Sequence, residues 1–183
     1  GESYAIIAGR RCGKTSFLKY LYFHLDNFET DWFYRPLPIL LDLHSSNLKS
    51  AEHIYLSLLR HLHSRIDPNM EERLENSWSQ MVDLTQPWYQ ELLVATEISF
   101  EQFERALIYI VTEINRADPK VAPVCIILEL DEMDYVLGQP WTETLLNQMR
   151  SMINQGILSD KVRWVMAGSY HLLQDVQFRG STL

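Results

Sequence analysis

Residues 8–15 read AGRRCGKT, and their types and spacing suit the binding of a phosphate group. The segment matches the pattern G-x-x-x-x-G-K-[ST] at every fixed position except the first, where Ala8 replaces glycine. Ala8 is tolerated if its backbone keeps a negative φ. Glycines let backbone N–H groups turn toward an anion, and a helix that starts after the loop adds partial positive charge. Lys14 is expected to reach the β- and γ-phosphates of a nucleotide, and the Thr15 hydroxyl to bind Mg²⁺.

The remaining loop positions are open to more than one interpretation. Arg10 and Arg11 either add positive potential beside the phosphates or are solvated loop arginines. Cys12 fills a loop position, and the weaker alternative is a thiol whose pKa the following helix lowers. The predicted nucleotide-binding residues are those of the loop and the first helical turn: Ala8, Gly9, Arg10, Arg11, Cys12, Gly13, Lys14, Thr15 and Ser16.

Asp131 and Glu132 follow an apolar strand predicted over 124–130. Hydrolysis of a phosphate ester needs a metal anchor and a group that orients or deprotonates water. We therefore expect Asp131 to hold Mg²⁺ through its water shell and Glu132 to be the general base, the alternative being two solvated carboxylates. Glu129 shares a strand face with Asp131, at a position where an apolar residue is expected. We therefore expect it either at a wet edge of the sheet or paired with a basic residue. Asp134 is either a second acid near the metal or, by preference, a helix-start or surface residue.

Ser169 closes another predicted strand, which spans 162–167 and ends in Gly168. If that strand lies between the first and the third strands of the chain, the Ser169 side chain would point toward the γ-phosphate and sense its presence. The alternative is a serine that caps a following helix at 170–176.

Alternating strands and helices are expected to position these residues. Strands are predicted at 4–8, 37–43, 124–130 and 162–167, and helices at 13–25, 51–62, 100–114 and 140–153. Pro38 is compatible with a strand only near its beginning, and Pro140 suits a first helical turn. The alternation predicts an α/β fold with a mainly parallel sheet. Residues 65–99 are acidic and break the pattern, so they are interpreted as a partly helical insertion.

Composition narrows the class of protein. The chain has 183 residues, a net charge of −8 and 46% hydrophobic residues, which suits one folded domain. No apolar run approaches the length of about 18 residues that crosses a bilayer, so no membrane contact is expected. Two cysteines make no disulfide framework and favour a cytoplasmic location. The abrupt ends at Gly1 and Leu183 suggest an excerpt of a longer chain.

Three blocks together resemble P-loop NTPases of the additional-strand class, which includes the AAA+ and STAND ATPases. The blocks are residues 8–16, 126–132 and 163–169. The paired arginines and the Gly-Ser strand end are most similar to the STAND and archaeal-type branch. The resemblance implies a three-layer αβα sandwich in which the strands ending at Asp131 and Ser169 lie beside the loop strand. The departures are Ala8, the 65–99 insertion and a fifth strand and helical lid that are not found.

The resemblance also implies an activity. It is Mg-dependent ATP binding and hydrolysis that drives a conformational or oligomerisation switch in a larger signalling or defence protein. The implied partners are ATP or ADP and either further copies of the chain or neighbouring domains. The residues that would carry the activity are Lys14, Glu132 and Ser169 in catalysis, with Thr15 and Asp131 at the metal.

Two alternatives stay open. One is a nucleotide switch that binds without hydrolysis, and the other is a DNA-associated ATPase, which the charge of −8 disfavours. The chain has no Asn-Lys-x-Asp segment, which favours adenine over guanine, and no G-x-S-x-G nucleophile elbow. The six histidines have no metal-ligand spacing, so no metal other than nucleotide-bound Mg²⁺ is expected.

Overall fold

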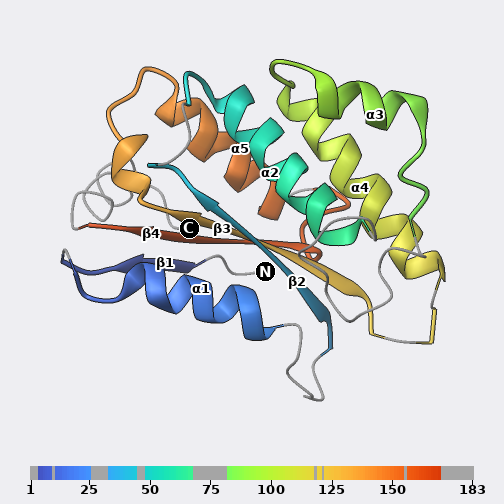
Figure 1. Ribbon diagram of the computed structural model, residues 1–183, viewed down its shortest axis with the longest axis horizontal. Coiled ribbons are helices and arrows are strands. Elements are labelled where there is room, and N and C mark those ends of the chain that lie inside the picture. Colours follow the sequence, from blue (N-terminus) through green and yellow to red (C-terminus); the bar gives the residue numbers. More distant parts are fainter. Residues whose placement is uncertain are drawn as a thin grey trace.

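The computed structural model describes residues 4–9, 11–25, 33–44, 48–67, 82–117, 119–120, 122–154 and 156–169. In chain order its elements are β1 (Tyr4–Ile7), α1 (Lys14–His24), β2 (Arg35–Asp42), α2 (Ala51–Ile66), α3 (Pro87–Val94), α4 (Phe100–Ala117), β3 (Val124–Asp131), the short 3₁₀ helix η3 (Met133–Tyr135), α5 (Thr142–Asn154) and β4 (Val162–Gly168). They are labelled in Figure 1 where there is room. The helix predicted at 170–176 lies outside the described residues.

The four strands form one parallel sheet in the order β1-β4-β3-β2. This confirms the predicted α/β fold with a parallel sheet. β4 pairs with β1 on one side and with β3 on the other, which is the order on which the expectation for Ser169 depended. All four carboxyl ends therefore lie at the same end of the sheet.

The two faces of the sheet are covered differently. α1 lies on one side, and α2, α4 and α5 lie on the other, with α3 beyond α2 and α4 (Figure 1). The larger core includes Trp164 of β4, Tyr55 of α2 and Phe103 of α4, all essentially inaccessible to solvent. On the α1 side, Leu18 packs against Val165 and against Ala167. A narrow second core thus fixes the helix that follows the predicted phosphate loop.

β2 begins two residues earlier than predicted and contains two prolines. The expectation that Pro38 must lie near the strand's start is wrong, because β2 is the edge strand of the described sheet. Successive N–H groups alternate between the two sides of a strand, and Arg35 donates toward the β3 side, to Pro123 O (2.8 Å). Pro36 and Pro38 therefore lie on the outer edge, where the ladder requires no donor. On that edge His61 of α2 donates from Nδ1 to the carbonyl oxygen of Leu40 (2.7 Å).

The helix boundaries follow local stereochemistry. α2 continues to Ile66 and stops at Asp67, whose backbone is extended, as expected for the residue before Pro68. α5 begins at Thr142, so the prediction that Pro140 opens this helix is wrong by two residues. Within the 65–99 segment, α3 is held to α2 because Arg60 donates to the carbonyl oxygens of Leu93 and Ala95 (2.9 Å each).

No helix within the described ranges is both long and apolar enough to cross a membrane.

Glu129 lies in the middle of β3 and is completely buried. Its register neighbours are Leu40 and Val165, which places it on the α1 face of the sheet. Neither carboxylate oxygen has a hydrogen-bond partner in the described structure. Burial raises the pKa of Glu129 to about 8, and the positive charge of Arg65 opposes this shift. A wet sheet edge, one of the two expected environments, is therefore excluded.

We expect the free energy of unfolding to fall as pH rises from about 5 to 8. Over this range the unfolded Glu129 ionises, whereas the folded one, with a pKa near 8, stays protonated. The folded state then binds more protons, so stability decreases with pH. Glu129→Gln should remove this decrease and be more stable than the wild type at pH 8 by about 2–4 kcal/mol. Denaturant titrations at pH 5 and pH 8 measure both quantities. The exposed Glu97→Gln serves as control, and equal pH slopes in the wild type and Glu129→Gln would contradict the assignment.

Candidate functional site

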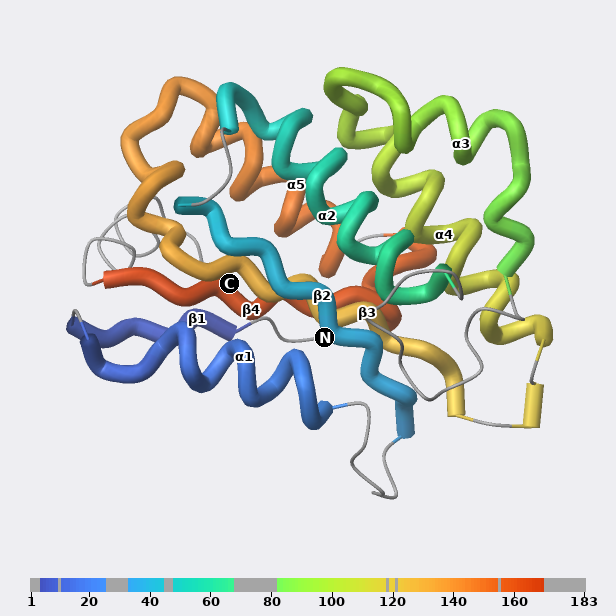
Figure 2. The backbone as a smooth tube through the Cα atoms, viewed as in Figure 1, coloured from blue at the N-terminus to red at the C-terminus, as the bar shows by residue number. Residues whose placement is uncertain are grey.

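A cleft of about 990 Å³ opens at the carboxyl end of the sheet. The start of α1 and the ends of β3 and β4 lie together at this end of the molecule (Figure 2). The lining residues come from the loop, from α1 and from the ends of β2, β3 and β4: Arg11, Cys12, Gly13, Lys14, Thr15, Ser16, His44, Glu132, Asp134, Tyr135 and Ser169. Eight of the twelve predicted site residues therefore meet in one cavity, whereas Ala8, Gly9 and Asp131 do not line it.

The loop between β1 and α1 contains a left-handed residue at Gly13, as expected for a glycine directly before a helix. Gly13 has φ 82°, the left-handed region that glycine adopts without a steric cost, and it precedes the first residue of α1. Its carbonyl oxygen accepts the N–H of Phe17 at 2.9 Å, which closes the first helical turn. Ala8 has no positive φ, so the replacement of glycine there causes no strain.

Lys14 folds back over the loop. Its Nζ donates to the carbonyl oxygens of Ala8 and Gly9, each at 3.0 Å. The ammonium group is thus held at the rim of the loop, in the cavity where a phosphate would enter. Arg10, also predicted to bind nucleotide, lies outside the described residues.

Asp131 and Glu132 are separated by the turn that ends β3. Asp131 is buried, and its Oδ1 accepts the N–H of Glu132 at 2.9 Å. Glu132 then adopts a left-handed backbone, with φ 58°, which turns its side chain into the cleft. Asp131 is not among the residues that line the cavity, so of these two carboxylates that of Glu132 faces it.

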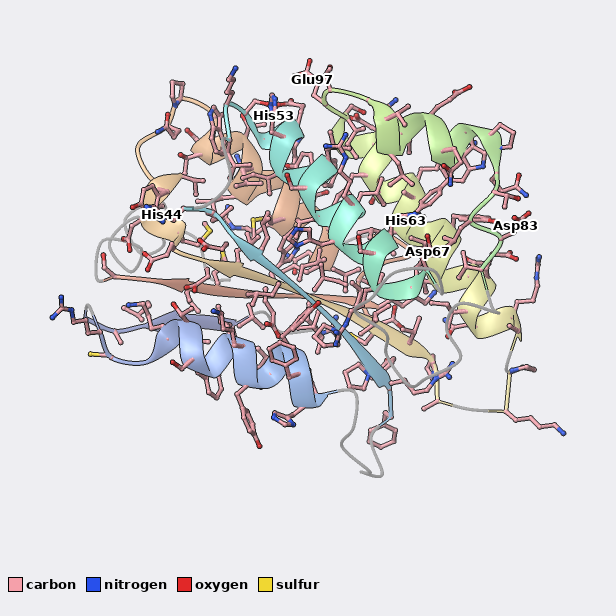
Figure 3. All side chains as sticks on the ribbon, viewed as in Figure 1. His44, His53, His63, Asp67, Asp83 and Glu97 are labelled. Atoms are coloured by element: carbon pink, nitrogen blue, oxygen red, sulfur yellow. The ribbon has the colours of Figure 1, made fainter. Side chains whose placement is uncertain are left out.

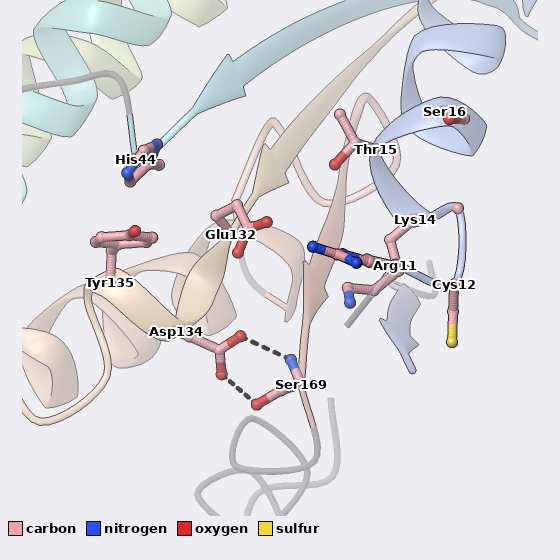
Figure 4. A pocket seen from close by; sticks show the side chains of 11 residues that line it. Arg11, Cys12, Lys14, Thr15, Ser16, His44, Glu132, Asp134, Tyr135 and Ser169 are labelled. Atoms are coloured by element: carbon pink, nitrogen blue, oxygen red, sulfur yellow. Dashed lines mark hydrogen bonds between the residues drawn. The ribbon is translucent and has the colours of Figure 1, made fainter. Parts of the chain in front are cut away.

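Arg11 and Glu132 are the two non-glycine residues with positive φ in the described part of the chain, at 61° and 58°. Both line the cleft, from opposite walls, and their side chains extend into it (Figure 4). A left-handed backbone at such residues is strained and is retained where the surrounding structure imposes it. The strain at these two positions therefore supports a site in which a cation and a carboxylate are aimed into the same space.

Asp134 lies in the first turn of the short helix η3, the helix-start position that the sequence favours, but its bonds to Ser169 were not predicted. Its carboxylate accepts two hydrogen bonds from Ser169, one from the backbone N–H (2.8 Å) and one from the hydroxyl (2.6 Å). These bonds connect the end of β3 to the end of β4 across the floor of the cleft (Figure 4).

His44 and Tyr135 complete the wall opposite the loop and were missed as site residues. Their rings pack together with centroids 4.5 Å apart (Figure 4). The backbone N–H of His44 donates to Asp42 Oδ1 at 2.9 Å, which closes a turn at the end of β2. The available signal was their place just after a strand, since the ends of parallel strands converge at one edge of the sheet.

Comparison with models of protein families finds no match to this chain, and comparison with curated proteins finds none either. The residues of the cleft therefore carry the functional assignment by themselves.

The donor set of the cleft fits magnesium. Mg²⁺ prefers oxygen ligands and keeps several waters, so it is bound through one or two protein oxygens together with the phosphates of a substrate. Thr15 lines the cleft and offers a hydroxyl, and Glu132 and Asp134 line it and offer carboxylates. Asp131, the other predicted ligand, is buried and does not line it. Among the described residues no group of three or more His, Cys, Asp or Glu side chains could hold a metal by itself. His44, His53 and His63 lie well apart on different parts of the fold (Figure 3).

Proposed function

We propose that the protein binds ATP with Mg²⁺ and hydrolyses it, and that the cycle drives a conformational or oligomerisation switch. The observation that carries this proposal is the cleft itself. Residues 11–15 of the GRRCGKT segment lead into α1 at the carboxyl edge of a parallel sheet, and Glu132 and Ser169, which follow the strands β3 and β4, line the same cleft. A helix N-terminus with a glycine loop favours an anion, and a carboxylate across the cavity is placed to activate water.

Each residue has a defined task in the proposed reaction. Lys14 would leave the loop carbonyls to bind the β- and γ-phosphates, and Thr15 with Asp131 would hold Mg²⁺, which supplies charge neutralisation at the phosphates. Glu132 would accept the proton of the attacking water. Arg11 adds a positive charge on the loop side of the cleft, opposite Glu132 (Figure 4).

The proposal extends to architecture and context. The positions of α1 and of α2, α4 and α5 support a three-layer αβα sandwich of the P-loop NTPase type. The partner of the switch would be a further copy of the chain or neighbouring domains. Two cysteines, Cys12 and Cys125, are too few for a disulfide framework, which is consistent with a cytoplasmic protein.

Titration of the wild-type protein with ATP and with GTP, in Mg²⁺ and in excess EDTA, tests the proposal. We expect saturable binding of ATP that weakens about tenfold when Mg²⁺ is removed, because the metal neutralises the phosphates beside the buried Asp131. Release of inorganic phosphate is measured on the same samples. Binding without phosphate release would favour the non-hydrolysing switch, and the absence of saturable binding would contradict the proposed function.

A further inference from the structure

The hydroxyl of Ser169 is already engaged inside the cleft. It donates to Asp134 Oδ1 at 2.6 Å, while the backbone N–H of Ser169 donates to Asp134 Oδ2 at 2.8 Å. Both carboxylate oxygens are thus used by one residue of the neighbouring strand end. Bonds to an ionised carboxylate are shorter and stronger than bonds between neutral groups. The arrangement, here called the Asp134–Ser169 clamp, is a defined contact between two walls of the cavity.

A serine hydroxyl has one proton and two lone pairs. While that proton is donated to Asp134, Ser169 offers only lone pairs to the cavity and cannot donate to an anion. A phosphate oxygen that enters near Ser169 must therefore compete with the carboxylate for the proton. Asp134 is half-buried, so water can reach its Oδ1 when the hydroxyl leaves.

We propose that Asp134 is a positioning residue that competes with the γ-phosphate of ATP for the hydroxyl proton of Ser169, so that the clamp is closed without a triphosphate and opens with one. The inference rests on the proposed function and adds to it the means by which the site distinguishes ATP from ADP. ADP has no γ-phosphate, so with ADP the Ser169 hydroxyl stays bonded to Asp134. With ATP, the hydroxyl turns to the phosphate, and of the two bonds of the clamp the one from the backbone N–H of Ser169 remains.

The test compares the dissociation constants for ATP and ADP in four proteins: wild type, Asp134→Ala, Ser169→Ala and the double variant. Removal of Asp134 frees the serine proton without removing the serine. We expect Asp134→Ala to raise the ratio of the ADP constant to the ATP constant about tenfold over the wild type, the scale of one charge-assisted hydrogen bond. The double variant should show the same ratio as Ser169→Ala, because the gain depends on the hydroxyl.

Any of three results would overturn the inference while leaving the proposed function intact. The first is an equal gain in affinity for ATP and ADP in Asp134→Ala, which would show only the loss of a negative charge near the phosphates. The second is a gain that persists in the double variant. The third is normal binding with an unchanged ratio. If the wild type binds neither nucleotide, the proposed function fails and the inference with it.

Asp134→Asn provides a second variant that keeps the shape of the side chain and one acceptor oxygen. We expect its ADP to ATP ratio to lie between those of the wild type and Asp134→Ala, since a neutral acceptor competes less well for the proton. The exposed Asp160→Ala is the matched control and should leave the ratio unchanged. Thermal unfolding of each variant verifies that it folds.

Discussion

Lys14→Ala is expected to raise the dissociation constant for Mg-ATP about 100-fold or more, because Lys14 is the amine predicted to contact two phosphates. In the structure its Nζ is held at 3.0 Å from the carbonyl oxygens of Ala8 and Gly9, within the loop that would surround the phosphates. The two carbonyl groups are only partly buried, so water can replace the amine at these oxygens when it is removed. Isothermal titration calorimetry with ATP measures the effect directly.

Lys19→Ala is the matched control for this experiment. Lys19 lies on the same helix and is exposed, but it does not line the cleft. Its removal changes the net charge equally and should change the ATP affinity by less than about twofold, since an exposed charge outside the site is screened. If the two variants bind ATP equally well, Lys14 has no role in phosphate binding and the proposed site is wrong.

Glu132→Gln is expected to bind ATP as the wild type does and to lose turnover by about 100- to 1,000-fold, the usual contribution of a general base. Glutamine has the shape of glutamate and the same cost in the left-handed backbone that Glu132 adopts, at φ 58°. The variant therefore removes the proton acceptor and leaves the turn after β3 intact. Steady-state phosphate release gives the rate, and calorimetry gives the affinity.

The exposed Glu91→Gln on α3 controls for the loss of one negative charge and should keep the wild-type rate. Equal rates of phosphate release in the wild type and Glu132→Gln would exclude Glu132 as the base. Together with the Lys14 variants, this experiment separates binding from chemistry: the first pair of proteins differs in affinity, and the second pair differs in rate at equal affinity.

Much of the fold could be predicted from the sequence because it depends on local patterns. The apolar run at 124–130 and the stripe of Phe103, Leu107, Ile110 and Ile114 each repeat with the period of their element. The predicted boundaries are within a few residues of those of β3 and α4. The predictions are wrong where residues distant in the sequence determine which residue types a position accepts. In β2, Pro38 is tolerated because no strand of the described sheet pairs with the outer edge of β2.

The residues of the candidate site also fall into two groups, those predictable from local spacing and those brought together by the fold. Gly13, Lys14 and Thr15 are close in sequence and were predicted from their spacing, because one loop and one helix N-terminus form that part of the cavity. His44 and Tyr135 belong to different strand ends, 91 positions apart in the printed sequence, and no local pattern links them. The pairing of strands alone brings them to one wall.

The sequence by itself determined the glycine turn before α1, the acidic end of β3 and the alternation that makes the sheet parallel, because each depends on residues that are neighbours along the chain. The tertiary structure decided the rest. It placed β4 between β1 and β3, buried Glu129 under α1, and joined Asp134 to Ser169 across the cleft. These contacts depend on which strands pair and in what register, and that outcome is set by the packing of the whole core.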